Sequence, residues 1–133
     1  MGCDIHLYFE KKNKHGEWEE LEVDPRLIPD DRNYRLFGFL AGVRNDEIPP
    51  QFERRGIPED TSLPKGENGY GLGDHDFTHA YLDEILDAPW KEYELEWSDF
   101  YIFCFNTLPK LLYGIGFSKL DERNVRVLIG FDS

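Results

Sequence analysis

The chain has 133 residues, enough for one domain with its own core, and its 40% apolar content includes three Trp, seven Tyr and ten Phe. Its 27 acidic and 15 basic side chains give a formal net charge of −12. A field of that sign repels phosphate backbones and anionic lipid, so the composition argues against binding to nucleic acid or to a membrane surface.

The sequence also lacks the segments that direct a chain into or across a membrane. No apolar run approaches the ~20 residues of a bilayer span, and the first residues show neither the basic start nor the apolar stretch of a signal peptide. Cys3 and Cys104 are far apart and form no paired-cysteine motif, so we expect two reduced thiols. Together these features predict a cytoplasmic protein.

The first predicted elements form a hairpin. Residues 3–9 alternate between an apolar face and a polar face, and Asp4, His6 and Tyr8 share the polar one. A Gly-containing turn through residues 12–16 leads to a second strand over 18–23. A loop of five residues, an odd number, brings Leu21 and Val23 onto the apolar side of the sheet.

The middle of the chain predicts short helices around a long loop. Asp30 and Asp31 are N-cap candidates for a helix over 31–42 that ends at Gly42. Residues 45–76 contain Pro49, Pro50, Pro58 and Pro64 and show no sustained periodicity, and an ordered loop of that length usually serves a function. The apolar spacing over 78–87 is typical of a short amphipathic helix.

The C-terminal third predicts a helix and a strand. A helix over 98–113 begins at Ser98, ends at Gly114 and is kinked at Pro109 unless Thr107 caps a new helix, and residues 100–105 also fit a strand. Residues 124–132 alternate as a final strand. We therefore expect one α+β domain over 1–133, in which a mainly antiparallel sheet of three or more strands is covered on one face by the helices at 98–113 and 31–42. The first and last strands are natural neighbours in that sheet.

Two groups of polar residues are candidates to hold a ligand. Asp4 and His6 point the same way, and an acid and an imidazole so placed can share a divalent metal or a proton, although a solvated sheet face would look the same. His75 and His79 are four residues apart and would share one face of a helix. The glycines at 69, 71 and 73 are not followed by Gly-Lys-Ser/Thr, so a phosphate loop is not supported.

A third group lies in the long loop. Arg54 and Arg55 precede Gly56, and Arg44 follows the predicted helix. A guanidinium binds phosphate or carboxylate through two parallel hydrogen bonds, and a glycine lets the backbone approach a ligand. The competing interpretation is that these arginines form surface ion pairs with the many acids, and that Arg44 balances a helix dipole.

Four stretches, in the same order, resemble a family of small phage and prophage proteins that are mostly described as hypothetical. They are residues 1–6 (Met-Gly-Cys-Asp-Ile-His), 34–44, 55–62, and the His75 region leading into 82–85. The family carries no activity that can be transferred, but the resemblance implies a phage-encoded protein of the bacterial cytoplasm. The family's recurring positions fall here on Asp4, His6, Arg44, Arg55, Gly56, Asp60, Ser62 and His75. Around His75 the family has a His-Ser-rich segment with a Trp, from which this chain departs.

Our leading hypothesis is a protein that binds a small, anionic, nucleotide-like ligand, such as a host immune signal, and so counters host defence. Arg44 and Arg55 would hold phosphate, while Asp4, His6, Asp60 and Ser62 would bond ribose or base. Gly56 and His75 complete the predicted site, and Tyr8 or Trp18 would stack on a base. No cofactor or metal is required, and a homo-oligomer that completes a shared pocket stays open.

Two other functions fit the same residues less well. In the first, Asp4, His6 and His75, with Asp74 or Asp76, hold a metal ion in a phosphodiester hydrolase, and Arg55 stabilises the developing charge. In the second, the acidic surface blocks a basic host protein. All ligand-site hypotheses require the polar side of the first strand, the arginines and His75 to face one common hollow.

Overall fold

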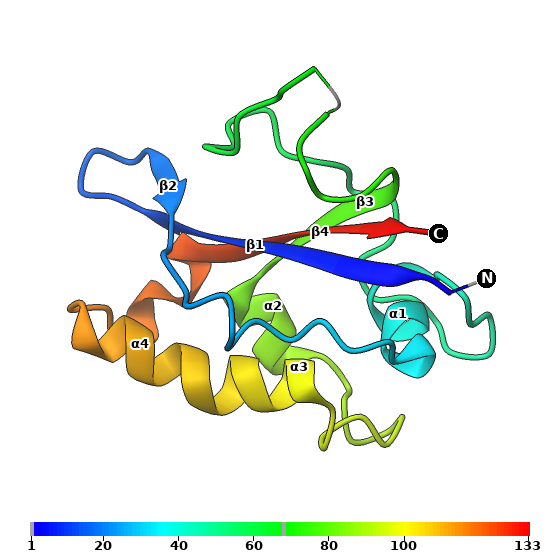
Figure 1. Ribbon diagram of the computed structural model, residues 1–133. Helices are drawn as coiled ribbons and strands as arrows, with labels where there is room; N and C mark the ends of the chain where they lie inside the picture. Colours follow the sequence, from blue (N-terminus) through cyan, green and yellow to red (C-terminus); the bar gives the residue numbers. More distant parts are fainter. Residues whose placement is uncertain (1, 68) are drawn as a thin grey trace.

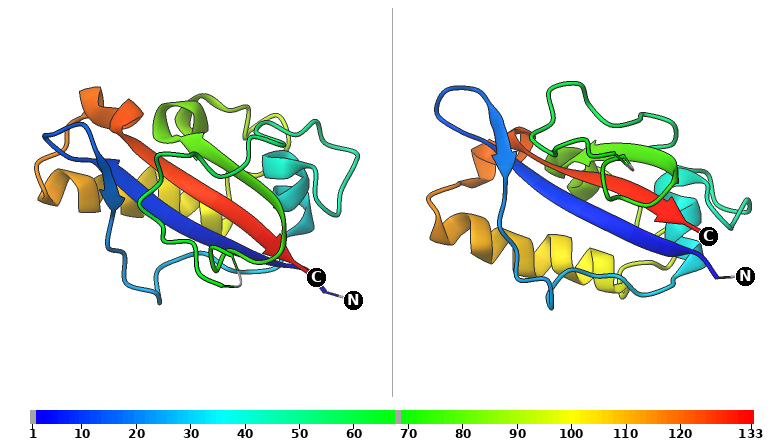
Figure 2. Two further views of the ribbon diagram at one scale, coloured as in Figure 1. Left: turned by 90° about the horizontal axis from the view of Figure 1, so that it is seen from above. Right: turned by 45° about the horizontal axis from the view of Figure 1, so that its top comes forward.

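The computed structural model describes residues 2–67 and 69–133, and centres on a four-stranded antiparallel sheet (Figure 1). The strands are β1 (Asp4–Lys12), β2 (Trp18–Glu20), β3 (His75–Tyr81) and β4 (Val125–Asp132), in the order β2-β1-β4-β3. The helices lie on one face of this sheet and the long loop crosses the other face (Figures 1 and 2). The predicted α+β class is therefore confirmed, including the pairing of the first and last strands from Asp4↔Asp132 to Lys11↔Val125.

The N-terminal hairpin follows the predicted register. Lys12 pairs with Trp18 across a loop of residues 13–17, in which Asn13 Oδ1 accepts hydrogen bonds from the amides of His15 and Glu17. β2 is shorter than predicted because it ends at Glu20, although the Leu21 amide still donates to the carbonyl of Phe9. Leu21 is buried as expected.

The helices at 31–42 and 98–113 lie where the sequence predicts them, but their first and last residues differ from the predicted ones. α1 (Tyr34–Ala41) starts later than predicted because Asn33, and not Asp30 or Asp31, accepts from the amide of the third helical residue. Gly42 ends it in the left-handed conformation, as expected. Ser98 caps α3 (Asp99–Ile102), and a π-helix (Phe103–Thr107) joins it to α4 (Leu108–Gly114).

The π-helix is the response of this segment to Pro109. Proline has no N–H to donate to the carbonyl four residues earlier, and the Leu108 amide instead donates to Phe103, five residues earlier. The segment is therefore helical throughout and not a strand over 100–105.

The prediction of a helix over 78–87 is wrong for its first half. Residues 75–81 form β3, and only α2 (Leu82–Asp87) is helical. Pairing with β4, from Thr78↔Ile129 to Tyr81↔Arg126, overrides the local helical spacing. Consequently His75 and His79 do not share a helical face.

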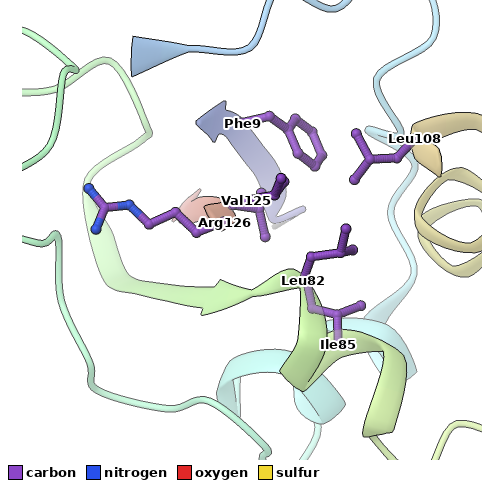
Figure 3. Close-up of a pocket in the computed structure, with 7 residues that line it drawn as sticks. Phe9, Leu82, Ile85, Leu108, Val125 and Arg126 are labelled. Carbon is purple, nitrogen blue, oxygen red and sulfur yellow. The ribbon is translucent and has the colours of Figure 1, made fainter. Parts of the chain in front are cut away.

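The core lies between the sheet and the helices. Phe37 of α1 packs edge-on against Phe131, with ring centroids 5.2 Å apart, and Phe9 packs against Phe103 of the π-helix at 5.0 Å. Phe9, Leu82, Ile85 and Leu108 surround a narrow gap that has no room for a water molecule (Figure 3). Arg126 borders this gap but extends away from the apolar side chains (Figure 3).

The long loop returns closely to the sheet before β3. A Cβ added at Gly130 would lie 1.9 Å from the carbonyl oxygen of Leu72, and one at Gly73 would lie 2.3 Å from that of Phe131. Glycine is therefore required for this close approach. The short 3₁₀-helix Lys119–Asn124 precedes β4. Within residues 2–67 and 69–133, no helix has the length and apolarity needed to span a bilayer.

Candidate functional site

The side of the sheet away from the helices carries a buried arginine. Strand alternation places Arg126 of β4 beside Glu10 of β1 and Tyr81 of β3 on this face, which we call the outer sheet face. The Arg126 side chain is only 1% exposed, and its Nε donates to Glu10 Oε1 at 2.7 Å. Its Cζ lies 3.9 Å from the centre of the Trp18 ring. A cation–π contact and an ion pair thus hold a charge that would otherwise be costly to bury.

The long loop closes over this ion pair. Glu10 Oε2 accepts hydrogen bonds from Ser62 N at 2.7 Å, Ser62 Oγ at 2.6 Å and Thr61 Oγ1 at 3.0 Å. Because the single Ser62 hydroxyl proton is donated to Glu10, the Tyr8 hydroxyl, 3.0 Å away, donates to Ser62 Oγ. Burial raises the pKa of Tyr8. The loop is thereby fixed on the outer sheet face.

The far end of the guanidinium is only partly satisfied. Arg126 Nη1 lies 3.0 Å from Asp60 Oδ1, whose side chain is 67% exposed. Arg126 Nη2 is buried and, within the described residues, has no hydrogen-bond partner. An unpaired buried donor costs about 1–3 kcal/mol, and such groups in native proteins are uncommon. Arg126, Glu10, Trp18, Asp60 and Ser62 are referred to below as the Arg126 cluster.

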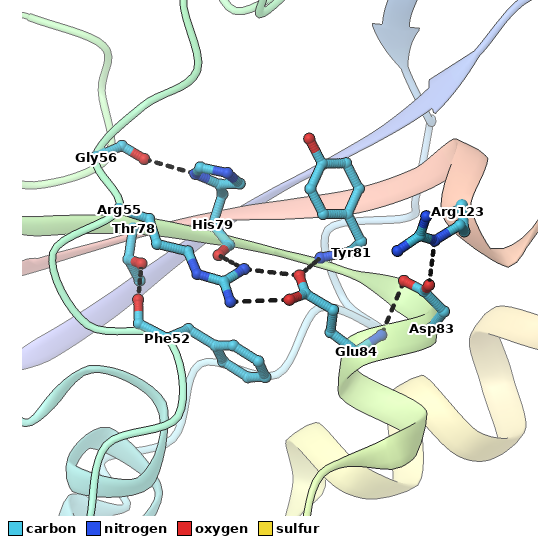
Figure 4. A network of polar contacts seen from close by, with 9 residues as sticks. All are labelled: Phe52, Arg55, Gly56, Thr78, His79, Tyr81, Asp83, Glu84 and Arg123. Atoms are coloured by element: carbon cyan, nitrogen blue, oxygen red, sulfur yellow. Dashed lines mark hydrogen bonds and ion pairs between the residues drawn. The ribbon is translucent and has the colours of Figure 1, made fainter.

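Aromatic side chains flank the Arg126 cluster. The rings of Trp18 and Tyr81 are 6.0 Å apart, and His79 meets Tyr81 edge-on at 5.8 Å. His79 Nδ1 lies 2.9 Å from the carbonyl oxygen of Gly56, whose own amide donates to Phe77. Figure 4 shows the Tyr81 ring standing up from β3 on the same side as His79. Rings so placed beside a guanidinium could pack against a planar ligand group.

Arg55 binds an acidic partner within the chain. Its Nη1 and Nη2 donate to Glu84 of α2 at 2.6 and 2.8 Å, and its Cζ lies 5.1 Å from the Phe52 ring (Figure 4). The hydrogen bonds from Arg55 lower the pKa of Glu84, which also accepts from the Tyr81 amide. An ion pair is therefore the observed arrangement, although its partner is not one of the loop acids.

Of the other predicted site residues, Asp4, His6 and His75 lie at the end of the sheet away from the Arg126 cluster, and Arg44 follows α1. Asp4 accepts from Arg32 at 2.8 Å, and this hydrogen bond lowers the pKa of Asp4. His6 Nε2 lies 2.5 Å from Asp132 Oδ2. His75 lies 2.6 Å from Asp76 and 2.9 Å from Ser133 Oγ, and Arg44 has its Cζ 5.7 Å from the Tyr34 ring.

The contacts therefore bring some of the predicted site residues together and leave the others apart. Asp60 and Ser62 belong to the Arg126 cluster, Tyr8 contacts it through Ser62, and Gly56 contacts the neighbouring His79. The remaining residues (Asp4, His6, Arg44, Arg55 and His75) contact other partners. Across residues 2–67 and 69–133, no three His, Cys, Asp or Glu side chains gather as a set of metal ligands.

Sequence reasoning missed the centre of the site, Glu10 and Arg126. Both could have been found, because Glu10 continues the polar face of Asp4, His6 and Tyr8, and Arg126 alternates with the inward Val125 and Val127. Comparison of the chain with known family models, with curated proteins and with solved structures yields no match.

Proposed function

We propose that this chain is a phage-type protein that binds a small, anionic, nucleotide-like ligand on its outer sheet face, at the Arg126 cluster. The observation that carries the proposal is the buried, unpaired Nη2 of Arg126. A guanidinium offers Nη1 and Nη2 as a two-pronged donor that matches two oxygens of a phosphate. Here only Nη1 has an acceptor, Asp60.

The ligand phosphate takes the place of Asp60. The Asp60 carboxylate is mostly exposed and makes a single contact with the guanidinium, so its displacement costs less than about 1 kcal/mol. Glu10 remains on Nε and keeps its hydrogen bonds to Ser62. The phosphate-binding group is therefore Arg126, not Arg44 or Arg55 as expected from the sequence, because Arg55 is bound at both Nη atoms by Glu84.

The neighbouring rings select a ligand with a planar part. Tyr81, which is partly exposed and packs against Trp18, provides apolar area for a base, while Tyr8 and Ser62 provide hydroxyls for a sugar. A nucleotide combines these chemical features. In a phage-encoded protein, capture of such a ligand would remove a nucleotide signal of the host and so counter defence.

Isothermal titration calorimetry with cyclic nucleotides, cyclic dinucleotides and ADP-ribose-type nucleotides tests the proposal. We expect at least one of them to bind, and the double variant Glu10→Gln/Arg126→Gln to lose that binding while remaining folded by circular dichroism. Asp60→Asn removes the competing carboxylate, so binding should tighten by about two- to fivefold, the value of an exposed ion pair.

Glu47→Gln is the matched control for Asp60→Asn. Its side chain is exposed, and the substitution changes the net charge by the same amount away from the cluster. Equal tightening in both variants would show a general charge effect. No binding by any of these nucleotides, to the protein or to Asp60→Asn, would refute the proposed function.

A further inference from the structure

The helical side of the molecule carries an apolar groove that the Arg126 cluster does not use. A hollow of about 370 Å³ lies between α2, the π-helix, α4 and the segment after α4. Its floor is formed by Leu82, Leu86, Phe105, Pro109, Leu112 and Phe117. A second hollow of about 330 Å³ shares Leu86 and Phe105 with the first and continues toward Trp90.

Large apolar side chains are left exposed at one end of the groove. Tyr113, which lines the first hollow, is 83% exposed, and Ile115 just beyond α4 is 52% exposed. The π-helix contributes Phe105 to both hollows, and π-helical turns occur frequently at functional sites. A continuous apolar groove of this kind is a typical docking surface for an amphipathic segment.

The acids along the groove determine which kind of segment fits. Glu122 lines the first hollow, and Glu92 and Glu96 line the second, whereas Lys91 is the one basic residue among the described side chains of the two linings. Among the described residues, none of these three glutamates forms an ion pair. A second copy of this chain, with a net charge of −12, would bring like charges together. A basic partner would instead place positive charges beside these glutamates.

We propose that this groove binds a basic amphipathic helical segment of another protein. The segment lays its apolar side chains over Phe105, Leu112 and Tyr113 and directs Lys or Arg toward Glu92, Glu96 and Glu122. This interaction goes beyond ligand capture, because α2 and α4, which form the groove, lie on the opposite side of the sheet from the long loop (Figure 1), and that loop closes over the Arg126 cluster.

A designed peptide provides the probe. It has about 18 residues, with Leu at helical spacing and Lys elsewhere. Binding is measured by fluorescence anisotropy of the labelled peptide and mapped on ¹⁵N-labelled protein by NMR. We expect saturable binding with shift changes concentrated in residues 105–117, and about a tenfold loss of affinity in Tyr113→Lys.

Leu27→Lys is the matched control, because it adds the same charge at another partly exposed apolar position, 48% exposed, that lines a different hollow. It should change the affinity by less than about twofold. Both variants replace exposed side chains, so both should fold. An equal loss in the two variants, or shift changes spread over the surface, would show that only net charge attracts the peptide. Sedimentation equilibrium that reveals a dimer broken by Tyr113→Lys would instead assign the groove to a second copy, and would also overturn the proposal.

Discussion

Replacing Arg126 by Gln removes the cation from a carboxylate that has no access to water. Glu10 is 0% exposed and keeps three neutral donors, from Thr61 and Ser62, after the substitution. Removing one partner of a buried ion pair typically destabilises a protein by about 3–5 kcal/mol. Because the three donors continue to solvate Glu10, we expect a loss near the lower end of this range, about 3 kcal/mol.

The reverse substitution, Glu10→Gln, should cost less. Arg126 retains Asp60 at 3.0 Å and the ring of Trp18, so we expect a loss of about 2 kcal/mol, the value of a hydrogen bond to a charged group. The double variant removes both charges, so it leaves no unpaired charge in the buried site. Its loss should be about 2 kcal/mol, which corresponds to a coupling energy of ~3 kcal/mol between the two side chains.

Urea unfolding followed by tryptophan fluorescence measures the three losses, with the free energy of unfolding obtained by linear extrapolation. The substitution Arg26→Gln, on a guanidinium whose side chain is 88% exposed, controls for the change in net charge and should cost less than about 0.5 kcal/mol. Additive losses, or a loss below about 1 kcal/mol for Arg126→Gln, would refute the view that this ion pair is tightly coupled.

Substitutions at three further positions test the structure elsewhere. Gly130→Ala should destabilise the protein by about 3 kcal/mol in thermal unfolding, because the new methyl would meet the Leu72 carbonyl, and a wild-type melting temperature would contradict this contact. Ser98→Ala should cost about 1–2 kcal/mol, because α3 loses its N-cap and the hydroxyl no longer donates to the carbonyl of Leu95. Ser98→Asp should not restore this stability, because the position is buried and a carboxylate cannot donate to Leu95. Arg55 lowers the pKa of Glu84 from 4.5, so the stability that this pair contributes is complete above that pH and is lost as the pH falls through the lowered pKa. Glu84→Gln should therefore flatten the acid side of the pH–stability profile, and an unchanged profile would show that the pair contributes nothing.

The elements that could be predicted are those whose local pattern and tertiary environment agree. The alternation over 3–9 and over 124–132 is enforced by burial on the helix side, and the structure confirms both strands. Gly42 ends α1 through its left-handed backbone conformation, and Ser98 begins α3 through a side-chain hydrogen bond. Both effects are local, so the sequence alone is enough to predict them. For β3 the pattern was misleading, because pairing with β4 decides its conformation and no local signal reports that pairing.

The site was harder to predict because the sequence does not reveal which partner a polar side chain contacts in the folded chain. Arg55 has the chemistry of a phosphate ligand, yet its choice of Glu84 depends on how the loop meets α2. The residue at the centre of the proposed site, Arg126, was overlooked inside a strand that alternates as a core element. Leu128 and Gly130 lie on the same face of β4 as Arg126. Because a strand face exposed to water would carry polar residues there, these two residues indicated that the face around Arg126 is covered.

The position of β4 between β1 and β3 has a consequence for synthesis of the chain. β4 is translated after every other element described here, yet it is the strand that joins the β1–β2 hairpin to β3. Until the ribosome has released it, β1 and β3 cannot enter a common sheet, and their apolar sides stay open to chaperones or to aggregation. The sheet should consequently form only after β4 has left the ribosome, in one cooperative event.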